Sequence, residues 1–167
     1  MTYVNPNVSK ALNSYTWQLL KTNLGYTDED YRGVSPIIPT QQQPEIMEIG
    51  KPFIVFGTSR HQSDHLYALR AGAVAYNIYA TKVVDVNRIA NLIAETFERQ
   101  DDAAADVNYW LHQTDFSDIS FGSIRTKMVQ EAEPTDEEGG MYSALVILEI
   151  KYTFDNPTLV TRLELAP

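Results

Sequence analysis

The feature that most constrains this fold is a run of strict alternation near the end of the sequence. In residues 141–154 every even position is apolar: Tyr142, Ala144, Val146, Leu148, Ile150, Tyr152 and Phe154. A period of two is typical of a β-strand that lays one face on a core. The segment therefore predicts a long strand, and the rest of the chain is expected to supply its partners and its cover.

The segment before it, residues 119–130, is also strand-like, but its apolar positions change parity. Such a switch indicates a β-bulge, which we expect near Gly122. Residues 131–140 are acidic and contain Pro134 and two adjacent glycines, so they predict a turn. Together the two strands predict one long C-terminal hairpin.

Other segments predict further strands of the same sheet. Residues 71–82 alternate like the hairpin, and residues 53–56 form a short apolar run that is expected to end at Gly57. Residues 159–165 carry apolar side chains at alternate positions and predict a short terminal strand after Pro157. The sheet is therefore expected to be largely antiparallel.

Three segments show helical spacing. Residues 8–23 predict an N-terminal helix, residues 85–99 a central amphipathic helix, and residues 103–112 a second, shorter one. We expect Asp85 to cap the first central helix, Arg99 to lie in its last turn, and Asp101 or Asp102 to cap the second. The two central helices need one apolar surface to cover, and the long strands are the candidates.

Residues 26–52 show neither the period of a helix nor that of a strand. Four prolines interrupt this stretch of about 27 residues, and long irregular connections in small domains are usually functional or disordered. Its apolar side chains include Ile37, Ile38, Ile46 and Met47. We interpret it as an extended arm laid on a surface, either that of its own subunit or that of a neighbour.

These segments predict a single α+β domain over residues 1–167, with a mostly antiparallel sheet packed by an N-terminal helix and two central helices. The absence of cysteine excludes disulfides and thiolate chemistry. A formal charge of −9 argues against a protein that grips nucleic acid by its phosphates. No membrane contact is expected, and the opening residues lack the pattern of a secretory signal, which favours the cytoplasm.

Few residues suggest chemistry. His61, Asp64 and His65 are the only cluster with metal-ligand spacing, and a polar loop is the simpler interpretation. Residues 57–60 could bind an anion with their amides, but they lack the glycines and lysine of a phosphate loop. No nucleophile motif occurs, so we expect no enzyme and no cofactor.

The order of elements resembles a known family. Phe53-Ile54-Val55-Phe56, the strand at 75–80, the helix at 87–93, Asp106-Val107-Asn108-Tyr109-Trp110 and the turn at 137–140 are similar in succession and texture to the tail terminator or tail-completion (neck) proteins of tailed bacteriophages. The likeness covers roughly residues 50–155.

That resemblance implies a structural virion protein, assembled in the host cytoplasm, that forms a hexameric ring on the last ring of the tail tube. Its expected partners are further copies of itself, the tail tube protein, the head-completion or neck proteins and, in contractile tails, the sheath, while DNA passes through without specific binding. For subunit or partner contacts we single out the arm and the acidic turn: Ile37, Ile38, Ile46, Met47, Glu131, Glu133, Glu137 and Glu138.

Two alternatives remain open from the sequence. One is another connector of the same particle, such as a head-completion or sheath-capping protein. The other is a metal-dependent hydrolase built on His61, Asp64 and His65.

Overall fold

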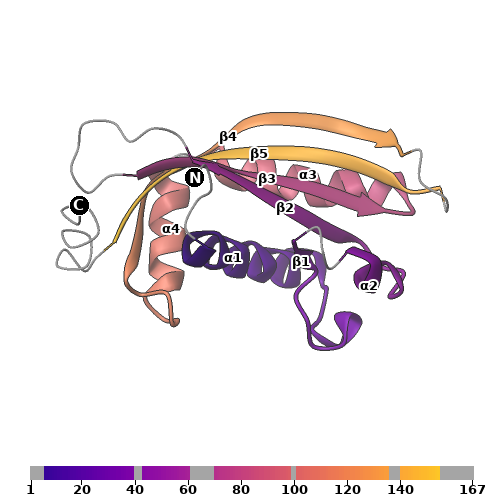
Figure 1. The fold of residues 1–167 in the computed structure, drawn as a ribbon, viewed down its shortest axis with the longest axis horizontal. Helices are drawn as coiled ribbons and strands as arrows, with labels where there is room; N and C mark the ends of the chain where they lie inside the picture. The colour runs from indigo at the N-terminus through magenta and orange to yellow at the C-terminus, as the bar shows by residue number, and fades with distance from the viewer. Residues whose placement is uncertain (1–5, 40–42, 61–69, 99–100, 136–139, 155–167) are drawn as a thin grey trace, which may run out of the picture.

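The structure is a computed structural model, and it describes residues 6–39, 43–60, 70–98, 101–135 and 140–154. Four helices, one 3-10 turn and five strands follow one another along these residues (Figure 1). Their order is α1 (Pro6–Leu24), η1 (Glu29–Tyr31), β1 (Ile37–Ile38), α2 (Gln43–Met47), β2 (Phe53–Arg60), β3 (Arg70–Ala80), α3 (Val83–Phe97), α4 (Asp101–Leu111), β4 (Ile119–Pro134) and β5 (Tyr142–Phe154).

The five strands form one sheet in the order β1-β2-β3-β5-β4. β1 runs parallel to β2, and every other neighbouring pair is antiparallel. The α+β class and the mostly antiparallel sheet are therefore confirmed. The long C-terminal hairpin is confirmed as well, and because β5 inserts between β3 and β4, β4 becomes one edge of the sheet.

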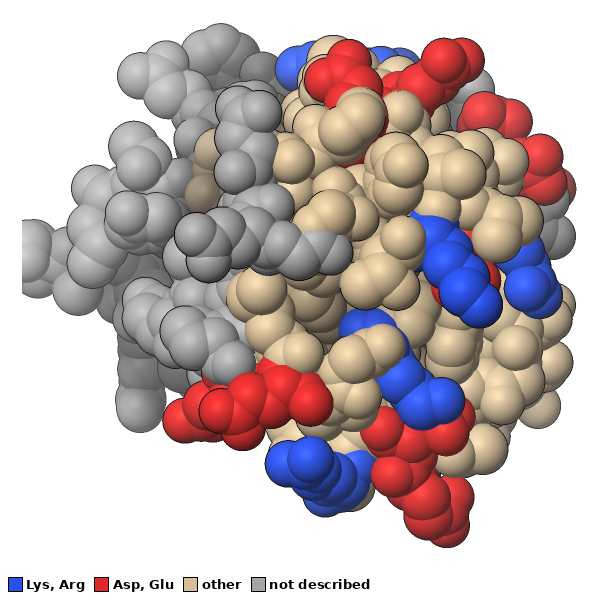
Figure 2. Space-filling view, turned by 90° about the vertical axis from the view of Figure 1, so that its right-hand side faces the viewer, with Lys and Arg blue, Asp and Glu red and all other residues tan. Residues whose placement is uncertain are grey.

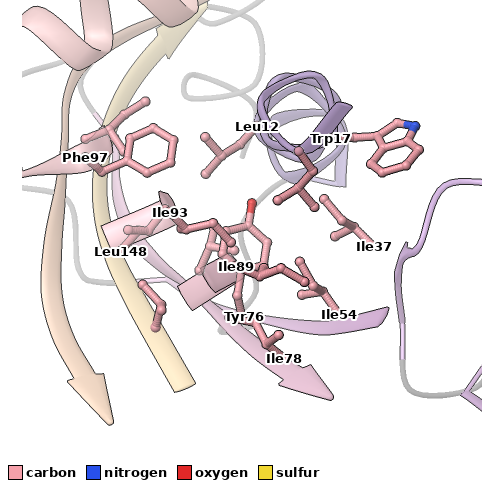
Figure 3. Close-up of a cluster of buried hydrophobic side chains, with 14 of the residues drawn as sticks. Leu12, Trp17, Ile37, Ile54, Tyr76, Ile78, Ile89, Ile93, Phe97 and Leu148 are labelled. Carbon is pink, nitrogen blue, oxygen red and sulfur yellow. The ribbon is translucent and has the colours of Figure 1, made fainter. Parts of the chain in front are cut away.

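The helices α1, α3 and α4 share one face of the sheet, which we call the inner face (Figure 1). The alternation of apolar residues along β5 explains why the helices lie on this face, because Val146, Leu148 and Ile150 are almost fully buried there. Figure 3 shows Leu148, Ile89 and Leu12 converging there from β5, α3 and α1. The prediction that the central helices cover the long strands is therefore confirmed.

Polar contacts fix the helices on the inner face at two points. The buried hydroxyl of Tyr76 in β3 donates to Asn13 Oδ1 of α1 at 2.7 Å and lies 3.4 Å from Thr16 Oγ1. On the other side, Thr126 of β4 donates to the Ala94 carbonyl of α3 at 2.8 Å. Because buried hydroxyls need partners, these bonds select one placement of each helix on the sheet.

The helix caps differ from the prediction. α3 begins at Val83 with Lys82 in the cap position, so Asp85 lies inside the first turn, where its charge still suits the helix dipole. α4 begins at Asp101 itself rather than after an aspartate cap. Arg99 lies outside the described residues. Cap residues are hard to place because helical periodicity identifies the buried face more sharply than the end.

β2 is longer than expected. We predicted that it ends at Gly57, but it continues through Arg60 because Gly57 to Arg60 pair with Ala75 to Gly72 of β3. The predicted turn at residues 57–60 is therefore wrong, and so is the loop that could have held an anion. In a local sequence pattern a glycine indicates the end of a strand. Here pairing with the neighbouring strand keeps the backbone extended past Gly57.

β4 is also longer than predicted and strongly irregular. The bulge expected near Gly122 is confirmed by a register shift between Phe121 and Ser123. Two more shifts follow, and the strand runs on to Pro134, so Glu131 and Glu133 belong to β4 and not to a turn. A proline is tolerated at this position because β4 is an edge strand whose outer side needs no ladder hydrogen bond.

The arm at residues 26–52 is laid on its own subunit. Its Tyr31 is almost fully buried, packs edge-on against Trp17 of α1 at 5.5 Å between ring centroids, and donates its hydroxyl to the Pro52 carbonyl. The arm also contributes β1, which pairs with Ile54 and Val55 of β2. It is therefore a folded edge of the domain and not a free extension.

Candidate subunit interface

The predicted contact residues of the arm are mostly buried. Ile37, Ile38 and Ile46 expose 6%, 2% and 5% of their surface, because the two β1 side chains pack into the sheet and Ile46 closes over them from α2. In the folded subunit these three residues hold the arm in place. Of the four predicted residues, Met47 is exposed, at 36%.

The acidic residues lie at the opposite edge of the sheet. Glu131 and Glu133 are exposed on β4, whereas Glu137 and Glu138 fall outside the described residues. Since β1 and β4 are the two ends of the strand order, the predicted residues do not form one patch. They mark two separate edges instead.

Two exposed apolar side chains on β4 were not among the contact residues predicted from the sequence. Met128 and Val129 expose 44% and 42% of their surface. Met128 pairs with Ile147 of β5, which pairs with Ala75 of β3, so an apolar row crosses the sheet on the face opposite the helices, its outer face. Ile147 and Ala75 are only partly buried there. Val129 pairs with Val146 instead, so its side chain lies on the inner-face side of β4. Exposed apolar side chains such as that of Met128 are candidates for a contact surface.

A group of charges borders that apolar row. Arg125 donates to Glu149 Oε2 through both Nε and Nη2, at 2.8 and 2.6 Å, and Lys127 Nζ lies 3.5 Å from Glu149 Oε1. The hydrogen bonds from Arg125 hold the pKa of Glu149 below its ordinary value. The carboxylate thus stays charged at neutral pH and fixes both cations beside the apolar row.

The free backbone edge of β4 is protected at its beginning. The side chain of Asn108 in α4 donates from Nδ2 to the Phe121 carbonyl at 2.8 Å, and its Oδ1 accepts from the Phe121 N–H at 2.7 Å. An amide side chain thereby takes the place of a neighbouring strand. Together with the three register shifts, it makes edge-to-edge pairing of β4 with another strand difficult.

The arm supplies the second exposed patch. Val34 exposes 54% of its surface just after the buried Tyr31, whose carbonyl accepts the Val34 N–H. With Met47 it places two exposed apolar side chains on the arm, next to β1. We call the outer-face row that begins at Met128 the β4 patch, and the exposed side chains of Val34 and Met47 the arm patch. The two patches belong to opposite edges of one sheet.

Among the described residues, charge does not gather into one surface at the hairpin end of the molecule. Figure 2 looks onto that end and shows acidic and basic side chains interspersed with uncharged ones. The net charge of −9 is therefore not expressed as a single acidic patch on this face. On this face a partner would contact uncharged side chains and charges of both signs, and not a surface of a single charge.

Potential metal ligands do not cluster in the described parts of the chain. These residues contain no group of three or more potential metal ligands, and His61, Asp64 and His65 lie outside them. The strongly raised pKa values of Tyr31 and Tyr76 come from burial and keep both phenols protonated. None of the described helices is long and apolar enough to cross a membrane.

Comparison with known proteins gives no further guide. No family model matches this sequence, and no curated protein matches it.

Three exposed apolar side chains, those of Val34, Met128 and Val129, were not among the residues singled out from the sequence. The exposure of Met128 could have been found from the parity switch in residues 119–130, because a bulge on an edge strand changes the face on which the following side chains lie. Val34 had no comparable signal. Nothing in its local sequence distinguishes an exposed valine from the buried isoleucines three and four residues later.

Proposed function

We propose that this protein is a structural subunit of a tailed-phage particle that closes into a ring of six copies on the end of the tail tube and stops tube growth. The observation that carries the proposal is the presence of exposed apolar side chains at opposite edges of one sheet, Met128 in the β4 patch and Val34 with Met47 in the arm patch. A ring needs two different surfaces that meet head to tail, and these patches meet that requirement.

The proposed place in the virion, the end of the tail tube, rests on the resemblance in the order of elements to tail terminator or tail-completion proteins. A terminator would also present a surface to the head-completion proteins and, in contractile tails, to the sheath.

The test is electron microscopy of the purified protein mixed with polymerising tail tube protein from the same source. Rings on one tube end, with tube length reduced, are expected. No binding and no change in tube length would reject the terminator role. Binding to neck proteins or to sheath without binding to the tube would instead assign the protein to the connector alternative.

Charged variants test the two patches. Met128→Glu and Val34→Glu are each expected to abolish rings while leaving the melting temperature of the subunit nearly unchanged, because both side chains are exposed. Val84→Glu is the matched control, since Val84 is 56% exposed on α3 and belongs to neither patch. Rings that survive both edge variants would contradict the proposed contact.

A mixing experiment tests the head-to-tail arrangement. Equal amounts of the Met128→Glu and Val34→Glu subunits retain one intact β4 patch and one intact arm patch between them. They are expected to form a heterodimer that cannot close, visible by native mass spectrometry. Homodimers in either single preparation would indicate a twofold contact and would overturn the ring geometry.

A further inference from the structure

An apolar groove, which we call the α1 groove, lies between α1 and the β1 edge of the sheet. Its volume of about 530 Å³ falls within the usual range of small-molecule sites. Trp17 of α1 and Ile37 of β1 lie next to each other on its wall (Figure 3). Phe56 of β2 and Phe116, from the loop before β4, add two further aromatic rings. These side chains suit the aliphatic part of a small molecule.

The polar groups of the α1 groove come from one face of α1. Lys10, Asn13 and Ser14 line the groove beside Trp17, and their spacing of three and four residues places them together on the helix. None of the described residues that line the groove is acidic, and α1 has no acidic residue in its first turn. Lys10 is exposed, and within the described ranges it has no ion pair. The polar side of the groove is therefore positively charged.

The side chain of Asn13 is fixed beneath this polar side. It exposes 8% of its surface, and its Oδ1 accepts a hydrogen bond from the fully buried hydroxyl of Tyr76 at 2.7 Å. The amide nitrogen Nδ2 has no acceptor among the described residues, although a largely buried N–H donor needs one. Because Asn13 lines the groove, its Nδ2 offers a fixed donor to an oxygen atom bound there.

We propose that the α1 groove binds the anion of a medium-chain fatty acid. The carboxylate lies between the Lys10 ammonium and Asn13 Nδ2, since charge-assisted hydrogen bonds are the strongest that these two donors can form. The aliphatic chain packs against Trp17, Phe56 and Phe116. This proposal does not depend on ring formation.

Ligand analogues separate the two parts of this recognition. In isothermal titration calorimetry of the full-length protein, decanoate is expected to bind saturably. Decanol keeps the chain without the charge, and butyrate keeps the charge with a short chain, so each is expected to bind at least about tenfold more weakly. Equal binding of decanoate and decanol would overturn the carboxylate site. Equal binding of decanoate and butyrate would overturn the apolar site, and no binding of decanoate would overturn both.

A lysine variant tests the charged end of the site. Lys10→Met is expected to weaken decanoate binding by about fivefold or more, because it keeps an aliphatic stem and removes the cation. Lys151→Met is the matched control, since Lys151 is exposed on β5 and pairs with Ala71 on the outer face, away from α1. Unchanged affinity in Lys10→Met, or an equal loss in the two variants, would overturn the proposal.

The two tryptophans of the chain report where the ligand binds. Trp17 lines the α1 groove, whereas Trp110 lies on α4 and does not belong to the described lining. In ¹H–¹⁵N correlation spectra the indole signal of Trp17 is expected to shift with added decanoate more than that of Trp110, and Trp110→Phe assigns the two signals. A Trp17 signal that moves no more than that of Trp110 would place the ligand elsewhere and overturn the proposal.

The α1 groove and the arm patch share Val34, so one further comparison separates ligand binding from ring formation. Val34→Asn is expected to weaken decanoate binding, whereas Met47→Asn, on the same arm but outside the described lining of the groove, is not. Equal losses in these two variants would contradict the site. Met128→Glu, which is expected to abolish rings, should bind decanoate as the wild type does. Failure of either proposal is thereby recognised without the other.

Discussion

The two edges of the sheet are protected in different ways. At the β1 edge the chain folds back on itself, and the arm buries Tyr31, Ile38 and Ile46 against the body. At the β4 edge the strand stays open and is made irregular by three register shifts and by the side chain of Asn108. A covered edge and a bulged edge both avoid uncontrolled pairing. At the β4 edge the register shifts and Asn108 limit access to the backbone, so exposed side chains are the groups that this edge presents.

The largest effect is expected where the arm is anchored. Tyr31→Ala removes a buried ring that packs against Trp17 and Tyr26, and should lower the free energy of unfolding by about 3–5 kcal/mol. Urea unfolding measures this loss. Tyr31→Phe keeps the ring and loses only the bond to Pro52, so about 1 kcal/mol is expected. Similar losses for the two variants would mean that the arm is not held by packing.

The next largest effect on stability is expected at Asn108, whose side chain takes the place of a neighbouring strand at the β4 edge. Asn108→Ala removes both bonds to the Phe121 backbone and should cost about 1–3 kcal/mol. Hydrogen exchange should show faster exchange at Phe121. Asn87→Ala, at an exposed position of α3, serves as a control with no expected change. A loss no larger than that of the control would show that the β4 edge does not need this cap.

A smaller effect is expected where β4 meets α3. Thr126→Val removes the bond to the Ala94 carbonyl while keeping a similar shape, and should cost about 0.5–1.5 kcal/mol in thermal or urea unfolding. A loss as large as that of Tyr31→Ala would contradict the view that the arm edge is the more strongly anchored of the two.

The smallest effect is electrostatic. The pKa of Glu149 is lowered in the folded protein by Arg125, so its contribution to stability is present above the ordinary pKa of 4.5 and disappears as pH falls through the lower folded value. The pair is largely solvent-accessible, so Glu149→Gln should cost about 0.2–1 kcal/mol at pH 7 and less at low pH. Unfolding curves of the wild type and of Glu149→Gln at pH 7 and at low pH measure this difference. A loss of stability that is larger at low pH than at pH 7 would contradict the prediction.

The core of the fold could be predicted from particular residues. The even positions of β5 and the apolar stripe of α3 both face the interior, because burial of one face imposes a period of two on a strand and 3.6 on a helix. The extent of β2 beyond Gly57 could not be predicted, since it depends on pairing with Ala75 in another strand. The candidate contact surface was predicted only in part, because Ile37 and Met47 have similar local sequence signals but opposite exposure.

The sequence by itself determined the α+β class, the long hairpin, the bulge near Gly122 and the absence of cysteine chemistry, because each follows from composition or from short-range periodicity. The tertiary structure alone decided that the arm covers its own subunit, that β5 lies inside the sheet and β4 at its edge, and that Met128 and Val34 are exposed. These outcomes depend on which distant segments pack together, and a local pattern of apolar residues records that a side chain needs cover but not which segment provides it.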